Sequence, residues 1–174
     1  MGRKSTIADN IYLLARENIN LTREQASEEM DFISKDRIER IERGEALPHP
    51  EEILAMSKAY QDPYLCNLYC SKECLIGQQY VPEITLKDLS SIVLKLVNAI
   101  YNVEEQKRRI IEISADGELT DDEYVDFAEF QTNLERLSIA TEALQLWKEN
   151  LEAQRRIDPK KLEQALIQAK EHCR

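Results

Sequence analysis

Three cysteines give this chain its clearest potential for metal chemistry. Cys66, Cys70 and Cys74 are four residues apart, and a fourth cysteine is Cys173. Thiolates bind zinc or iron–sulfur clusters, but those sharing one zinc ion lie about 3.8 Å apart, whereas residues eight apart on a straight helix are about 12 Å apart along its axis. All three could share a metal only if the helix unwinds near Ser71. Free cysteine also fills helix stripes as a buried apolar residue, so we expect structural cysteines, no metal and no other cofactor.

A second stretch with chemical potential is ISKDRIERIERGEALPHP, residues 33–50. Ile38 and Ile41 are spaced to bury one side of a short helix. The outward positions then carry Lys35, Asp36, Arg37 and Arg40. Lysine and arginine can donate to guanine O6 and N7, and aspartate can accept from cytosine N4. This face could therefore contact base edges, although a charged helix face can also be a solvated surface.

Helical periodicity runs through nearly the whole chain and predicts an all-α fold. In the first half, the helices are expected to begin at residue 7, Thr22, Ser34, Pro50 and Asp62-Pro63. The first helix has an apolar stripe of Ile7, Ile11, Leu14 and Ala15. Thr22 and Gln25 form a capping-box pattern, and Ser34 and Gly44 suit the start and the end of the third helix. A capped second and third helix separated by a tight turn are typical of helix-turn-helix geometry, in which the third helix lies in the major groove.

The second half of the chain has longer periodic segments. We expect GQQYVPEIT, residues 77–85, to be a linker between residues 1–76 and residues 86–174. Helices over 86–113 and up to about residue 154, with a last short helix from Pro159, predict an antiparallel helical hairpin plus one added helix. The second of these has a near-heptad seam of Phe127, Phe130, Leu134, Leu137, Leu144, Trp147 and Leu151. This seam could dimerise the protein or pack the hairpin against itself.

Residues 21–60, LTREQASEEMDFISKDRIERIERGEALPHPEEILAMSKAY, resemble the lambda-repressor-like, or Xre-family, helix-turn-helix domain. The matching pieces are Leu21-Thr22-Arg23-Glu24-Gln25, Ile33-Ser34, Ile38-Glu39-Arg40-Ile41-Glu42-Arg43-Gly44 and Pro48. The resemblance extends over about residues 7–75 and implies a five-helix, DNA-binding domain. It places Arg23 and Arg43 on phosphates and Lys35, Asp36 and Arg40 at base-reading positions, with Arg37 and Ser34 beside them. This chain departs from the family at the turn, where Asp31 replaces the usual glycine and the turn is one residue longer.

The charge of the chain restricts where a polyanion could bind. The net charge is −10 over 174 residues. Residues 1–80 carry 10 Lys+Arg and 14 Asp+Glu, which gives −4, and residues 81–174 carry 13 and 19, which gives −6. An acidic surface does not attract DNA. The first half can therefore bind DNA only if its positive side chains gather on one face.

The sequence gives no indication of an enzyme or of a membrane protein. The only histidines are His49 and His172, and no glycine-rich phosphate loop, nucleophile elbow or metalloprotease motif occurs. The N-terminal apolar run is interrupted by polar residues and does not resemble a signal peptide or a membrane span. We therefore expect a cytoplasmic protein without catalytic activity.

Taken together, these patterns predict a sequence-specific, DNA-binding transcriptional regulator. A helix-turn-helix protein of this size is expected to bind double-stranded DNA as a homodimer on a pseudo-palindromic site. The alternative is a protein-interaction adaptor or antitoxin-like partner, in which the acidic C-terminal helices bind a protein and DNA binding is weak or absent.

Overall fold

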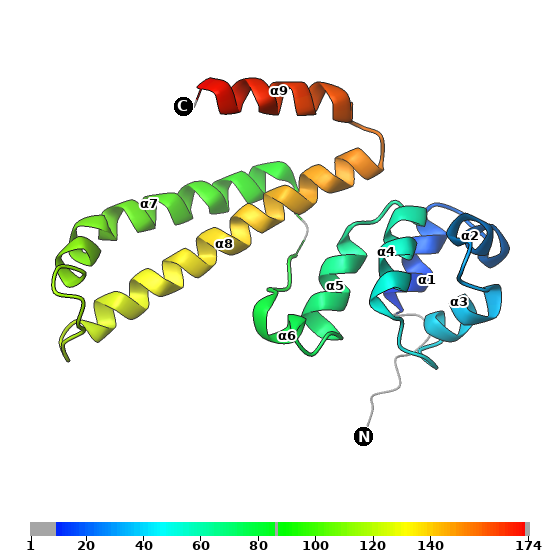
Figure 1. Cartoon of the computed structure of the whole chain (residues 1–174), viewed down its shortest axis with the longest axis horizontal. Coiled ribbons are helices and arrows are strands. Elements are labelled where there is room, and N and C mark those ends of the chain that lie inside the picture. Colours follow the sequence, from blue (N-terminus) through cyan, green and yellow to red (C-terminus); the bar gives the residue numbers. More distant parts are fainter. Residues whose placement is uncertain (1–9, 86, 173–174) are drawn as a thin grey trace. The chain divides into compact units, whose positions relative to one another are not determined.

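The computed structural model describes residues 10–85 and 87–172, and this part of the chain contains helices and connecting turns but no strand (Figure 1). The expected all-α fold is confirmed. Contacts divide the chain into two compact units, Met1–Glu83 with Glu149–Arg174, and Ile84–Lys148. The domain limits expected from the sequence, 1–76 and 86–174, stay a prediction.

The first unit contains the five short helices that the sequence predicts, within the described residues. Their bounds are α1 Ile11–Asn18, α2 Arg23–Met30, α3 Lys35–Glu42, α4 Pro50–Ala59 and α5 Tyr64–Lys72. The capping box is confirmed, because the Thr22 side chain accepts from Gln25 N and the Gln25 side chain accepts from Thr22 N. Ser34 caps α3 by accepting from Arg37 N, and Gly44 has a φ of 67°, which glycine adopts without strain.

The turn between α2 and α3 is built on an unusual backbone conformation. Asp31, which stands where the family has glycine, has φ 53° and ψ −45°. The N–H of Phe32 donates to the carbonyl of Met30 across it, at 2.6 Å. Such a three-residue turn with positive φ is strained for a residue that has a Cβ.

The core of the first unit brings α1 to α5 together. Tyr60, Ile33, Ile38, Ile41, Ile53, Met56 and Leu65 are almost completely buried in it. The apolar stripe expected for α1 is partly wrong. Tyr12, Ala15 and Arg16 are buried, whereas Leu14 is exposed, because the buried face of α1 is the one that carries residues 12, 15 and 16. Ile7 of the expected stripe lies outside the described residues.

The segment after α5 is not an extended linker throughout. It begins with α6, Gly77–Tyr80, which contacts α5. A Cβ at Gly77 would overlap the carbonyl oxygen of Cys70, so only glycine allows this close approach. Farther along, Asn67 Nδ2 donates to the carbonyl of Pro82 at 3.0 Å and Lys72 pairs with Glu83. Residues 77–83 therefore extend the first unit.

The second unit is formed by α7, Leu89–Ile113, and by α8, Tyr124–Ala153, as far as Lys148. The two helices run side by side in opposite directions (Figure 1). Arg109 Nε donates to Asp126 Oδ2 at 2.6 Å, and Asn133 Nδ2 donates to Gln106 Oε1 at 2.9 Å. The side chains buried on these helices are few, and three of the seven are alanines: Ile92, Ala99, Ile113, Asn133, Ala140, Ala143 and Leu146.

The heptad seam expected for α8 is only partly buried. Phe127 and Leu134 remain exposed, while Ala140 and Ala143 lie among the buried residues. The last helix, α9, extends over Pro159–His172 as expected from Pro159. Within the residues described, no helix combines the length and the apolar character that crossing a membrane requires.

Candidate nucleic-acid interface

Helix α3 is held in the domain by its isoleucines and presents its other side to solvent. Ile38 and Ile41 are 0% and 1% exposed. Ser34, Lys35, Asp36, Arg40 and Arg43 are all exposed. Helix α2 packs on α3, and the three-residue turn at Asp31 connects them. The structure therefore brings most of the predicted site residues to one exposed edge of the first unit.

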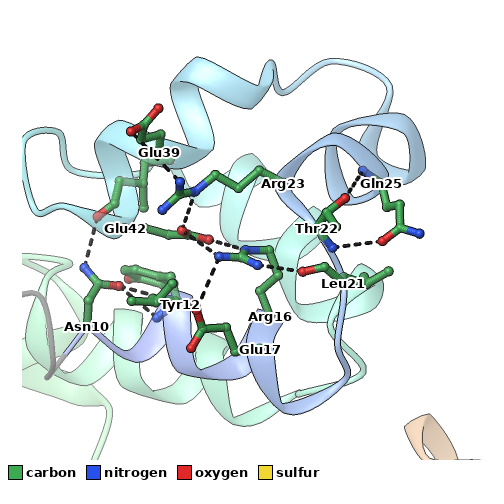
Figure 2. A network of polar contacts seen from close by, with 12 residues as sticks. Asn10, Tyr12, Arg16, Glu17, Leu21, Thr22, Arg23, Gln25, Glu39 and Glu42 are labelled. Carbon is green, nitrogen blue, oxygen red and sulfur yellow. Dashed lines mark hydrogen bonds and ion pairs between the residues drawn. The ribbon is translucent and has the colours of Figure 1, made fainter.

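A buried ion-pair network holds α3 on the side that faces the domain core (Figure 2). Glu42, at the end of α3, is 1% exposed and accepts from Arg16 Nε at 2.6 Å and from Arg16 Nη2 at 3.0 Å. Arg16 also donates to the carbonyl of Leu21 at 2.6 Å, and its hydrogen bond with Glu42 raises the pKa of the guanidinium further. On the other side, Asn10 Nδ2 donates to the carbonyl of Ile41 at 3.0 Å. The network sets the position of α3 relative to α1.

Arg23 connects this network to the exposed edge. Its Nε donates to Glu42 Oε2 at 2.8 Å, and its Nη1 lies 4.0 Å from Glu39 Oε1 (Figure 2). Glu39 also pairs with Arg43 on the next turn of α3. The two arginines expected to contact phosphates thus share one carboxylate on the exposed side of α3.

Lys35 is paired as well, across the two helices. Its Nζ lies 2.6 Å from Glu24 Oε1 on α2, with both side chains about half exposed. This hydrogen bond lowers the pKa of Glu24 and raises the pKa of Lys35, so the pair is ionised at neutral pH. A phosphate or a base edge would have to compete with Glu24 for the lysine.

Arg37 is turned away from this edge. Its Nε and Nη2 donate to the two oxygens of Glu52 at 2.8 and 2.7 Å, and Nη2 also donates to the carbonyl of Leu47 at 2.9 Å. The hydrogen bond with Arg37 lowers the pKa of Glu52. Glu52 in turn accepts from His49 N at the start of α4. Arg37 therefore connects α3 to α4, and a contact of Arg37 with a base would require this pair to open.

Arg40 differs from the other four cations of the site. Among the residues that the structure describes, it has no carboxylate partner, and its side chain is exposed. Asp36 lies one turn earlier on the same helix and is also exposed. Arg40 offers hydrogen-bond donors and Asp36 offers an acceptor, and neither has to leave an internal ion pair before it can contact a ligand.

Among the described residues, no three histidine, cysteine, aspartate or glutamate side chains are grouped closely enough to hold a metal ion. Cys66 and Cys70 lie on α5, and Cys74 follows the helix, with its Sγ accepting from Gly77 N at 3.4 Å. Burial raises the pKa of the Cys70 thiol, and the neighbouring Cys74 and Cys66 raise it further. A thiol of this kind stays protonated at neutral pH. Cys173 lies outside the described residues.

A model of the helix-turn-helix family matches residues 14–61, from within α1 to just past α4. This part of the chain is an Xre-type, lambda-repressor-like helix-turn-helix domain. The helix-turn-helix domain belongs to a family of DNA-binding regulators, and the resemblance noted from the sequence is confirmed. Comparisons with curated proteins and with solved structures gave no match.

Arg16 and Glu42 are a positioning pair that was not predicted from the sequence. A signal for them exists, because Glu42 follows Ile38 and Ile41 on the same side of α3, and Arg16 stands four residues after Tyr12 on α1. An ionisable residue within an apolar helix stripe needs a buried partner. The sequence alone does not show which partner it takes.

Proposed function

We propose that this protein is a sequence-specific transcriptional regulator in which α3 of the helix-turn-helix domain enters the major groove of DNA. The observation that carries this proposal is the orientation of α3, whose isoleucines are buried while Lys35, Asp36 and Arg40 face solvent. In helix-turn-helix complexes the N-terminal residues of this helix contact base edges. Arg40 and Lys35 would donate to guanine, Asp36 would accept from cytosine, and Arg23 and Arg43 would contact phosphates. Arg37 and Ser34 would hold the helix in place.

The protein would act as a dimer on a pseudo-palindromic site. One copy brings few basic side chains, and two copies double the phosphate contacts while placing two recognition helices about one helical turn apart. Selection from a random duplex library with the purified full chain tests the proposal, which predicts an enriched site with two related halves.

Arg40→Ala is expected to abolish the enrichment, since a bidentate arginine contributes about 1–3 kcal/mol of discrimination. Arg156→Ala is the matched control because it removes an exposed arginine outside the helix-turn-helix domain. Failure of the wild-type protein to enrich any site, or equal effects of the two variants, would contradict the proposal.

A second candidate function is a protein-interaction adaptor or antitoxin-like partner. It is favoured by the internal ion pairs of Arg23, Lys35, Arg37 and Arg43, which neutralise cations that DNA would otherwise attract. The two candidates differ in salt dependence, because the affinity of a DNA complex falls linearly on a log–log scale as salt rises. A protein that binds only other proteins would form no DNA complex at any salt concentration.

A further inference from the structure

The hairpin leaves a large apolar face uncovered. On α7, Leu89, Val93, Val97 and Ile100 are 39%, 41%, 55% and 51% exposed, and on α8, Phe127 and Leu134 are 38% and 42% exposed. We call these six residues the outer apolar face. Residues three, four or seven apart lie on the same side of a helix, so each helix contributes one stripe. On each helix the exposed stripe comes one position after the buried residues, as Val93 comes after Ile92 and Leu134 after Asn133. Because the two helices are antiparallel, this displacement brings both stripes to the same face of the hairpin.

The opposite face of the hairpin is different in character. It contains a shallow groove lined by Asn102, Tyr124, Val125, Ala128, Glu129, Thr132, Asn133 and Arg136. Asn102 is its one α7 residue, and its α8 residues mix the exposed Tyr124 and Val125 with the charged Glu129 and Arg136. The α7 stripe of the outer apolar face has no charged member, so the outer apolar face is the better suited of the two to a dry protein contact.

We propose that a second copy of this chain docks on the outer apolar face, so that two hairpins form a four-helix bundle. The first argument is area. With about 200 Å² for a fully exposed large side chain, the six residues leave on the order of 500 Å² of apolar surface. A standard interface buries about 800 Å² per partner, of which somewhat more than half is apolar. The α7 stripe, with about 370 Å² of this surface, therefore supplies most of what one half of a stable dimer needs, and Phe127 and Leu134 supply the rest.

The second argument is charge. Around the turn, residues 104–135 carry 3 Lys+Arg and 11 Asp+Glu, which gives −8. At the open end, residues 87–103 and 136–153 carry 4 of each and are neutral. The α7 stripe lies in this neutral part, and residues 89–103 include a single charged side chain, Lys95. Phe127 and Leu134 lie within the acidic residues 104–135, so two copies would meet over the α7 stripe, where their acidic turns stay apart, with these two side chains at the edge of the contact.

The chain's own last helix is the other candidate for this face. Helix α9 has 14 residues and spans about 21 Å, and the α7 stripe from Leu89 to Ile100 spans about 17 Å. The length of α9 does not exclude it, so the oligomeric state of the chain decides between the two occupants. The inference rests on the dimer in the proposed function, but its test needs no DNA.

Sedimentation equilibrium of the full chain at micromolar concentration is expected to give twice the chain mass of 20.2 kDa. Val97→Lys is expected to raise the dimer dissociation constant by roughly 100-fold, because the two-fold interface would bury two unpaired charges. The control is Val125→Lys, the same change on the opposite face of the hairpin, which should leave the dimer intact. Circular dichroism of both variants verifies that the helices persist.

Three outcomes would overturn the inference. A monomeric wild-type protein that Val97→Lys destabilises would mean that its own chain covers the face, and a monomer with unchanged stability would leave the face to a different protein. A dimer that dissociates with Val125→Lys but not with Val97→Lys would place the interface elsewhere. A dimer that dissociates with Val97→Lys but not with Val125→Lys, and that selects no DNA, would contradict the proposed function but support this inference.

Discussion

At the scale of single residues, Glu42 has the smallest exposed fraction of the charged residues described in the helix-turn-helix domain. It is buried, and both of its oxygens are used by Arg16, with Arg23 as a third donor group. A buried charge is tolerated only when it is paired and hydrogen-bonded. Its pairing keeps α1, α2 and α3 in a fixed arrangement, and the exposed edge of α3 depends on that arrangement.

Replacing Glu42 with glutamine should therefore destabilise the fold strongly. Glu42→Gln leaves Arg16 charged, buried and without its carboxylate, which costs about 3–5 kcal/mol in the free energy of unfolding. Chemical denaturation at neutral pH measures the loss. Glu17→Gln is a matched control, since Glu17 is a surface residue 4.0 Å from the same Arg16, and such pairs contribute about 1 kcal/mol or less. Equal losses in the two variants would contradict the role given to Glu42.

Glu24 is expected to limit DNA affinity because it pairs with Lys35. Glu24→Gln frees the lysine and removes a negative charge near the phosphates, so affinity for the selected site should rise by roughly fivefold at low salt. The gain should shrink as salt screens these charges. Fluorescence anisotropy with labelled DNA measures both effects. Glu28→Gln makes the same charge change one turn along α2, and an equal gain there would show that only bulk charge matters.

At the scale of elements, the turn between α2 and α3 stores backbone strain at Asp31. A glycine at φ 53° avoids the steric cost of a Cβ, so Asp31→Gly should raise the free energy of unfolding by about 1 kcal/mol. Thermal and chemical denaturation measure this change. Asp31→Ala removes the same charge but keeps the Cβ, and a stabilisation as large as that of the glycine variant would attribute the effect to charge instead of strain.

The contact between α3 and α4 should depend on pH. The hydrogen bond with Arg37 lowers the pKa of Glu52 in the folded state, and the unfolded carboxyl titrates near its usual pKa of about 4.3. The stability that this pair contributes is therefore present above about pH 4.3 and is lost as pH falls through the lower folded pKa. Glu52→Gln should be less stable than wild type at pH 7, with the difference closing in acid. A difference that stayed constant with pH would contradict this account.

The helix caps of these elements can be predicted from the sequence, but the ion pairs between them cannot. The capping box of α2, the Ser34 cap and the ends of α3 follow from local patterns, because capping depends on residues three apart. The direction of Arg37 does not follow, since its partner Glu52 is fifteen residues away on another helix. The same holds for Arg16 and Glu42, and for the exposed Phe127 and Leu134 in the expected α8 seam. Spacing identifies the face of a helix, but only tertiary packing decides which charges meet on it.

At the scale of the whole molecule, the proposed function requires an acidic protein with a net charge of −10 to bind DNA through one small edge. That edge offers Arg23, Lys35, Arg40 and Arg43, and three of these four are paired with the protein's own carboxylates. Binding would then exchange the internal ion pairs of Arg23 and Arg43 for phosphate contacts, and that of Lys35 for a base contact. The affinity should depend strongly on salt, and the acidic surface should disfavour non-specific complexes.

The salt dependence of the specific complex tests this arrangement together with the dimer. Two copies bring at most eight such side chains to DNA, so the slope of log affinity against log salt should lie between about −4 and −7. Val97→Lys, which is expected to separate the copies, should halve the slope on a single half-site, while Val125→Lys should keep the wild-type value. Anisotropy titrations at several salt concentrations measure all three slopes. A wild-type slope already at the half value would mean that one recognition helix binds alone, and the pseudo-palindromic site would then have no structural basis.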